Sequence, residues 1–376
     1  MDVVVTGIGL LSCLGSLQST WFKILQGKSG IRTHRLIPEL AEYPLGLINA
    51  RPSKIDDITH KLAIATLQNA GLEPPLTECG VVIGSSRGCQ ANWEQLASQE
   101  LSYVPQWLDT LHHQSAIVTA RYLQTQGVTI APMAACATGI WALARGYELI
   151  QTGCCQRVIV GAVEAPITPL TIAAFERMGA LATTGCYPFD RQREGLVLGE
   201  GGAMLVLETA ALARQRGAKI YGKIAGFGLT CDAHHISAPQ MTRGSAAIAI
   251  KQALDRSHLQ PQDIDYIHAH GTSTSLNDRH EAQLIQHIFP QPVAVSSTKG
   301  ATGHTLGASG AIATALTLMA LHNGYLLPCV GLAESEFDLN LVTKARQARI
   351  ENAMCFSFGF GGQNAVVALQ SKEGAY

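Results

Sequence analysis

The chain has 376 residues, of which 47% are hydrophobic and only 15% are charged, and its formal net charge is −1. This length and composition are those of a globular protein with a large buried core. The near-neutral balance excludes the strongly basic surface that is typical of nucleic-acid binding, so we expect no nucleic-acid partner.

Cysteine spacing and the absence of a leader indicate the compartment. Ten cysteines are spaced unevenly, and the only close pair, Cys154 and Cys155, makes a poor disulfide. A long chain with such cysteines is typical of a reduced, intracellular protein. Residues 1–15 lack the basic segment of a signal peptide. The longest helix-like apolar run, 311–321, is too short to span a bilayer. We therefore expect a cytoplasmic protein without a membrane span.

Strand-like and helix-like segments alternate along the chain. β-Branched runs predict strands at residues 3–9, 80–86, 128–134, 157–163, 203–208, 264–271, 292–298 and 364–369. Alanine-rich stretches predict helices at residues 61–71, 140–153, 244–257, 278–289 and 311–321. This alternation predicts an α/β fold in which helices cover both faces of a sheet.

The two halves of the chain resemble each other. Residues 198–208 (LGEGGAMLVLE) and 358–369 (FGFGGQNAVVAL) both place a G-x-G-G turn before an apolar strand. Upstream of each, a strand runs into a helix start of small residues, at 128–139 and 294–304. This order predicts a duplicated α/β unit whose halves meet near residue 210. Chance similarity among glycine-rich turns is the alternative explanation.

Cys136 lies between a strand predicted to end at Met133 and a helix predicted from about Thr138, in IAPMAACATGIW. Its small neighbours let the backbone turn sharply and leave open space around the sulfur. The N–H groups and dipole of a helix N-terminus favour a thiolate, and they could also stabilise an oxyanion. A small cysteine that fills a core gap is an equally good interpretation of this segment alone.

Three histidines are candidate companions of a nucleophilic thiol. His268 and His270 in HAHGTST share one face of a strand end, and His304 follows Lys299 in STKGATGHTLGASGA. Each histidine by itself is better explained as a hydrogen-bonded core residue. Taken together, Cys136, His270 and His304, each at a glycine-rich strand end, favour catalysis.

The sequence also bears on whether the protein binds a metal or a nucleotide cofactor. An alternative interpretation groups four residues as metal ligands of a hydrolase: His268, His270, His304 and Asp278. Such an enzyme would hold about one tightly bound ion per chain. No G-x-G-x-x-G segment follows a strand in the context that a nucleotide needs, so we expect no nucleotide cofactor.

Phe358, Gly359 and Phe360 form an aromatic turn in CFSFGFGGQNAV. Packing is the usual role of such aromatic side chains. A phenylalanine between glycines can instead act as a lid, and its N–H group can complete an oxyanion hole.

Nearly end to end, the chain resembles the β-ketoacyl-acyl-carrier-protein synthases, the condensing enzymes of fatty acid and polyketide synthesis. Four blocks carry the resemblance: AACATG, YPFDRQREGLVLGEGGAMLVLE, HAHGTSTSLNDRHEA and SSTKGATGHTLGASGA. The histidine of TGHTLGASGA is similar to that of the Cys-His-His branch, because the Cys-His-Asn branch places asparagine there. Thiolases would need a second catalytic cysteine in a C-x-G turn, and Cys355 is followed by Phe356 and Ser357.

The resemblance implies a thiolase fold, in which duplicated α/β halves form five α-β-α-β-α layers. Residues 1–208 would form the half with the nucleophile, and residues 209–376 the half with the two catalytic histidines. Cys136 would accept an acyl group from a carrier-protein or CoA thioester. His270 and His304, as neutral imidazoles, would stabilise the enolate that forms when malonyl loses CO2.

Further roles follow from the same resemblance. Lys299, paired with Glu281, would orient the second site. Thr272 and Thr274 would hydrogen-bond the phosphopantetheine arm. No metal or nucleotide is implied, because the acyl groups travel on the phosphopantetheine of the carrier protein or on CoA.

Aromatic residues and backbone N–H groups complete the implied site. The N–H groups of Cys136 and Phe360 would hold the oxyanion, and Phe360 would gate malonyl entry. Phe175, in FERMGAL, would line the acyl pocket, and Phe358 would bind substrate. The implied partners are an acyl carrier protein and a second copy of the chain, or a ketosynthase-like subunit in a heterodimer. A non-catalytic subunit of the chain-length-factor type is the alternative function, although such subunits usually lack the nucleophile.

The chain departs from the family before Cys136 and in one loop. Residues 35–67 and 87–117 replace longer family segments that shape the acyl pocket, the dimer contacts and the carrier-protein dock. Tyr187 and Gly179 occupy positions where the family often has arginine. The resemblance therefore leaves open the acyl chain length, the pathway and the choice of carrier protein or CoA as donor.

Overall fold

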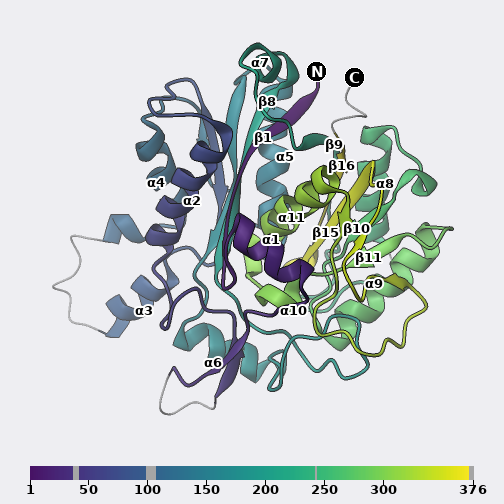
Figure 1. Cartoon of the computed structure of the whole chain (residues 1–376). Coiled ribbons are helices and arrows are strands. Elements are labelled where there is room, and N and C mark those ends of the chain that lie inside the picture. The colour runs from purple at the N-terminus through teal and green to yellow at the C-terminus, as the bar shows by residue number, and fades with distance from the viewer. Residues whose placement is uncertain (37–41, 99–106, 242–243, 372–376) are drawn as a thin grey trace.

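The computed structural model describes residues 1–36, 42–98, 107–241 and 244–371, and it is built around one large mixed sheet (Figure 1). Its strands, in chain order, are β1 Val3–Ser12, β2 Gly15–Ser16, β5 Gly80–Gly84, β6 Thr129–Ile130, β7 Arg157–Glu164, β8 Gly201–Thr209, β9 Gly222–Cys231, β10 Tyr266–His268, β11 Ala294–Ser296, β13 Asn340–Leu341, β15 Asn352–Gly359 and β16 Gln363–Gln370. Two small sheets pair β3 Arg32–His34 with β4 Tyr43–Leu45, and β12 Tyr325–Leu326 with β14 Arg346–Gln347.

The large sheet consists of two halves with the same topology. The first half runs β6-β5-β7-β8-β1 and the second runs β11-β10-β15-β16-β9. In each half the first three strands are parallel and the last three are antiparallel. The halves join edge to edge where Val3 pairs with Ile224 and Val5 with Gly222. This equivalence confirms the duplication, whereas the domain boundary at residues 208 and 209 stays a prediction.

Helices form three layers around the two half-sheets, as Figure 1 shows. The helices are α1 Leu17–Leu25, α2 Ile55–Ala70, α3 Gln90–Ser98, α4 Gln114–Leu123, α5 Thr138–Gln151, α6 Pro169–Arg177, α7 Ala210–Gln215, α8 Ser245–Ser257, α9 Ser275–Ile288, α10 Lys299–Thr302 and α11 Ser309–Asn323. α5 and α11 pack against each other between the half-sheets. α2 and α4 cover the outer face of the first half-sheet, and α8 covers that of the second, with α9 beside it. The five-layer arrangement is therefore confirmed.

α11 explains the most apolar helical run of the sequence. Every residue from Ser309 to Leu321 is buried, because half-sheets and α5 surround the helix. Within the described ranges, no helix is long and apolar enough to cross a membrane. All ten cysteines are unpaired.

Every predicted helix and strand exists, but three predicted strands are much shorter than expected. β6, β10 and β11 have two or three residues each, because the backbone after each strand bends into a loop of the site described below. The sequence patterns missed several elements: α1, α4, α6, β9 and β15. The expected aromatic turn is in fact the end of β15, followed by a short 3-10 turn at Phe360–Gly362.

Gly139 tests the contact between the two central helices. A Cβ atom at this position would lie 2.4 Å from the backbone nitrogen of Ala311. We expect Gly139→Ala to lower the free energy of unfolding by at least about 1 kcal/mol, since overpacking against backbone is costly. Chemical denaturation measures this change, with the exposed-residue variant Gln156→Ala as control. An unchanged unfolding midpoint for Gly139→Ala would contradict the tight contact.

Candidate active site

Cys136 lies on a strained turn between β6 and α5. Ala135 has a φ of 47°, in the left-handed region that non-glycine residues rarely adopt. Thr138 holds this turn, because its hydroxyl accepts the N–H of Ala134 at 2.8 Å and donates to the carbonyl of Ala135 at 2.7 Å. The side chain at position 136 therefore sits at the start of α5, as the sequence predicts, on a backbone bent sharply enough to present it to the neighbouring loops.

Small residues around Cys136 allow backbone segments from both halves to converge. A Cβ atom at Gly359 would lie 3.0 Å from the carbonyl oxygen of Ala134 and 3.0 Å from the nitrogen of Cys136. The end of β15 can therefore approach the turn only as glycine. Ser357 of the same strand donates its hydroxyl to the carbonyl of Cys136 at 2.8 Å, which ties the turn to the second half-sheet.

His270 lies two residues beyond the end of β10. Glu281 of α9 fixes its backbone, because the carboxylate accepts the N–H of His270 at 2.6 Å and that of Gly271 at 2.7 Å. Asp278, one turn earlier, accepts the N–H groups of Thr272 and Ser273 in the same loop. Two buried carboxylates of one helix thus set the course of this loop.

His304 follows α10 and is positioned by both its backbone and its ring. Its N–H donates to the carbonyl of Val197 at 2.6 Å, and its carbonyl accepts the N–H of Gly199 at 3.0 Å. The ring Nδ1 is hydrogen-bonded to the hydroxyl of Ser309 at 2.8 Å, which leaves the opposite edge of the ring for the pocket. The segment before β8 and the start of α11 therefore orient this side chain together.

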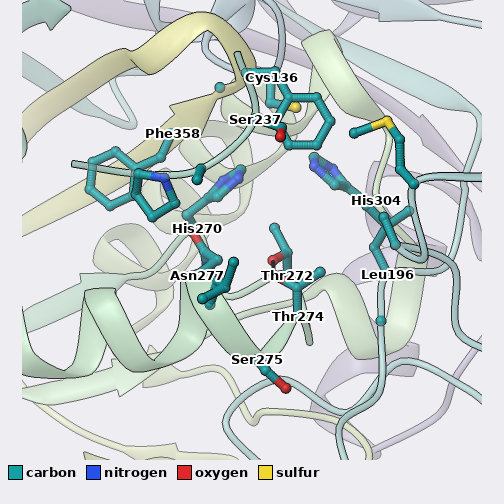
Figure 2. A pocket seen from close by; sticks show the side chains of 18 of the residues that line it. Cys136, Leu196, Ser237, His270, Thr272, Thr274, Ser275, Asn277, His304 and Phe358 are labelled. Atoms are coloured by element: carbon teal, nitrogen blue, oxygen red, sulfur yellow. Dashed lines mark hydrogen bonds between the residues drawn. The ribbon is translucent and has the colours of Figure 1, made fainter. Parts of the chain in front are cut away.

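The structure brings Cys136, His270 and His304 together at the bottom of one pocket. The sulfur and one ring nitrogen of each histidine all lie within 4.8 Å of one another, and Figure 2 shows both rings directed into the same space. The pocket has a volume of about 300 Å³, and Thr272 and Thr274 line its wall. Phe175, Phe358 and Phe360 also line it, so the substrate-binding residues predicted from the sequence share this site.

Burial determines the protonation of these three groups. It raises the pKa of the Cys136 thiol to about 11, although the charge of Lys299 acts in the opposite direction. Burial and then the charge of Lys299 hold the pKa of His270 and that of His304 well below the usual value. The histidines are therefore neutral, as expected. The expectation that the helix N-terminus yields a resting thiolate is wrong, because desolvation outweighs the local positive groups.

Lys299 and Glu281 are both buried behind the cluster, but they do not form the expected direct ion pair. The Lys299 ammonium donates to the carbonyl of His270, and Glu281 binds the N–H of that same residue. Burial lowers the pKa of Lys299 and raises that of Glu281, while their opposite charges counteract both shifts. The two side chains thus fix the backbone of His270 together, since Lys299 binds its carbonyl and Glu281 binds its N–H group.

The aromatic side chains that line the pocket form two separate contacts, one with His270 and one between Phe360 and Phe175. Phe358 packs edge-on against the ring of His270, with centroids 5.9 Å apart. Phe360 stacks on Phe175 at 6.0 Å and an interplanar angle of 27°. The backbone of Phe360 counteracts the effect of burial by lowering the pKa of the Cys136 thiol, so it lies beside the sulfur.

The alternative metal set is not assembled. His268 turns away from the pocket, and its Nε2 is hydrogen-bonded to the hydroxyl of Thr298 at 3.1 Å. The carboxylate of Asp278 is occupied by backbone N–H groups. The structure therefore does not support the alternative interpretation in which these two residues share a metal with His270 and His304. Among the described residues, the set with metal-compatible spacing is Cys136 with those two histidines.

The comparisons with known proteins agree with this site. Residues 57–213 match the family description Beta-ketoacyl synthase, N-terminal domain, and residues 221–333 match Beta-ketoacyl synthase, C-terminal domain. The chain belongs to the β-ketoacyl synthase family. The family is one of acyltransferases.

Relatives cover the whole length of the chain. The 3-oxoacyl-[acyl-carrier-protein] synthase 2 of Staphylococcus aureus is 32% identical over 410 aligned residues, covering 99% of this chain and 98% of that protein. The protein of the same name from Synechocystis is 34% identical, with the same coverage.

Solved structures confirm the thiolase fold. A chain from the complex of a type II polyketide acyl-carrier protein with its ketosynthase has a TM-score of 0.92 and 26% identity, covering 98% of this chain and 99% of that one. A chain of the ishigamide ketosynthase/chain length factor has a TM-score of 0.91 and 28% identity, with the same coverage. The fold is thus shared by ketosynthases and by complexes that contain chain length factors.

Sequence reasoning missed several residues of this β-ketoacyl synthase site. Ser357 and Ser309 hold Cys136 and His304, but single serines near glycines carry no distinctive pattern. Asp232 and Asn364 line the pocket and are hydrogen-bonded to each other at 2.7 Å. Asp232 directly follows β9 and Asn364 belongs to β16. No sequence pattern near either residue indicates that the two side chains meet.

Alkylation tests the protonation state of the nucleophile. Because the thiol pKa is raised to about 11, we expect the iodoacetamide rate at Cys136 to rise about tenfold per pH unit between pH 6 and 9. Mass spectrometry of the Cys136 peptide measures the rate, and the peptides of the exposed Cys154 and Cys231 are quantified separately. A plateau reached below pH 8 would show that the resting group is a thiolate.

Proposed function

We propose that this chain is a catalytically active β-ketoacyl synthase that performs decarboxylative Claisen condensation in fatty acid or polyketide synthesis. The observation that supports this most directly is the convergence of Cys136, His270 and His304 within 4.8 Å in one pocket. A non-catalytic partner of the chain-length-factor type is the alternative. The intact nucleophile and both intact histidines favour the active enzyme.

In the first half-reaction, Cys136 takes the acyl group. The sulfur attacks the thioester carbonyl, the bond to the carrier sulfur breaks, and the carrier leaves as a thiol. Since the resting thiol is protonated, a neutral imidazole of the cluster accepts its proton and passes it to the leaving thiolate. The N–H groups of Cys136 and Phe360 stabilise the tetrahedral oxyanion.

In the second half-reaction, His270 and His304 promote the loss of CO2. The bond between the malonyl carboxylate carbon and the α-carbon breaks, the carboxylate departs as CO2, and the electrons of that bond form an enolate whose oxygen accepts hydrogen bonds from two neutral imidazoles. Neutral donors suit this task, because negative charge grows on the oxygen in the transition state. The enolate carbon then attacks the carbonyl of acyl-Cys136, the carbon–sulfur bond breaks, and the Cys136 thiolate takes up one proton from solvent water.

The same proposal assigns carriers and partners. Thr272 and Thr274, whose hydroxyls are 2.9 Å apart in the pocket wall, bind the phosphopantetheine arm of an acyl carrier protein or of CoA. No metal or nucleotide takes part in the chemistry. We further propose a homodimer, with a heterodimer that includes a ketosynthase-like subunit as the alternative.

Substitution of the nucleophile separates the two half-reactions. We expect Cys136→Ala to abolish both acyl-enzyme formation and condensation. Cys136→Gln should abolish condensation but retain or increase malonyl decarboxylation, because the amide resembles the acylated side chain. Product analysis with malonyl-carrier substrate measures both activities, and Cys154→Ala, at an exposed cysteine, serves as the matched control. Condensation by either Cys136 variant would refute the proposed function.

His304→Ala separates acyl transfer from decarboxylation. We expect the variant to form acyl-Cys136, because His270 remains, but to lose decarboxylation by about 10²–10³-fold through the missing donor. Mass spectrometry of the acyl-enzyme and CO2 release measure the two steps. His268→Gln is the control, since that buried ring faces Thr298 rather than the pocket. Normal CO2 release by His304→Ala would contradict its assigned role.

A further inference from the structure

The loop after β5 is the counterpart, in the first half, of the loop after β10 that carries His270. β5 and β10 occupy the same place in their half-sheets, so both loops leave the same edge. In the first half this loop contains Arg87, three residues after the end of β5. Arg87 in the first half thus occupies a position similar to that of His270 in the second half.

Arg87 lies next to the proposed acyl-binding aromatic residue. Its Cζ atom is 5.8 Å from the ring centroid of Phe175, which in turn stacks on Phe360. The side chain is half-buried, and within the described part of the chain no hydrogen-bond or ion-pair partner contacts its guanidinium. The charge also reaches the nucleophile, because it lowers the pKa of the Cys136 thiol against the effect of burial.

Polar side chains continue from Arg87 along α3 and α6. The Nε2 atom of Gln90 donates to the hydroxyl of Thr168 at 3.0 Å and to that of Thr171 at 2.9 Å. Thr171 precedes Phe175 by one turn of α6, so the two side chains share a helix face. The surroundings of Phe175 therefore combine the apolar side chains of its core cluster with the guanidinium of Arg87 and with the polar network at Gln90. That network also includes the carboxylate of Glu94, which accepts the Nε2 of Gln90 at 2.7 Å.

Glu164 fixes the loop without neutralising the cation. Its buried carboxylate accepts the N–H of Ser86 and the hydroxyl of Ser85, the latter at 3.1 Å. Arg87 is not in ion-pair contact with it, although the charge of Arg87 lowers the pKa of this carboxyl group against the larger effect of burial. The carboxylate thus orients the loop backbone, and among the described residues the guanidinium of Arg87 has no ion-pair partner while it lies beside the ring of Phe175.

We propose that Arg87 selects the acyl group carried by Cys136, favouring chains with a carbonyl or carboxylate oxygen over unfunctionalised alkyl chains. This inference rests on the proposed function and names its substrate class. An alkyl chain beside Phe175 would remove water from an unpaired guanidinium without replacing its hydrogen bonds, which is unfavourable. An oxygen acceptor restores them, and a carboxylate adds charge assistance.

Acylation with matched six-carbon thioesters tests the selection. The wild-type protein is incubated with carrier-bound hexanoyl, 3-oxohexanoyl and 5-carboxypentanoyl groups, and the Cys136 adduct is followed by mass spectrometry. We expect at least one oxygenated chain to react about tenfold or more faster than hexanoyl, as one charge-assisted hydrogen bond allows. Whichever of the two reacts faster identifies the acceptor as a ketone or a carboxylate.

Variants of Arg87 assign the preference to this side chain. We expect Arg87→Met to lose the preference for oxygenated chains while still forming the hexanoyl adduct, and Arg87→Lys to keep part of it. Arg121→Met, at an exposed position in the last turn of α4, is the control and should match the wild type. Melting temperatures verify that each variant is folded.

The outcomes separate this inference from the proposed function. Equal rates for hexanoyl and both oxygenated chains in the wild type would overturn the role of Arg87, as would an equal slowing of all three by a folded Arg87→Met. Failure to form any Cys136 adduct would overturn the proposed function itself, and the selection with it.

Discussion

The close approach of backbone from the two halves is the constraint on which the site depends. Gly139 of α5 lies against Ala311 of α11, and Gly359 of β15 lies against the turn that carries Cys136. A Cβ atom would lie 2.4 Å from backbone at Gly139 and 3.0 Å from backbone at Gly359, so a side chain at either position would force neighbouring backbone to shift. Small residues are therefore needed around Cys136 so that the two halves can pack closely. This close packing brings Cys136 near His270 and His304.

Burial, rather than a local dipole, governs the chemistry of the cluster. The same desolvation that keeps the thiol of Cys136 protonated also keeps His270 and His304 neutral. Neutral imidazoles are the form needed to donate hydrogen bonds to an enolate. In the proposed mechanism, this enclosure favours the decarboxylation step, whereas the acylation step needs a proton acceptor, a role that we assign to the same imidazoles.

Duplication explains where the functional groups lie. Cys136 precedes α5 and His304 precedes α11, and these helices are equivalent in the two halves. His270 follows β10 and Arg87 follows β5, which are equivalent strands. Four side chains of three chemical types, one thiol, two imidazoles and one guanidinium, thus occupy two repeated positions around one centre. The repeat supplied the scaffold, and divergence at these positions gave the different side chains to which we assign acyl capture, decarboxylation and acyl selection in the proposed function.

The sequence by itself determined the alternation of elements, the repeat and the three candidate reactive residues, because short-range patterns mark strands and glycine-rich turns. It did not determine where β6, β10 and β11 end. It did not determine the thiol form of Cys136, since desolvation sums contributions from segments of both halves. Nor did it predict that Lys299 binds the carbonyl of His270, or that Arg87 lies beside Phe175. Those contacts join residues far apart in the chain, and only the packing of the layers brings them together.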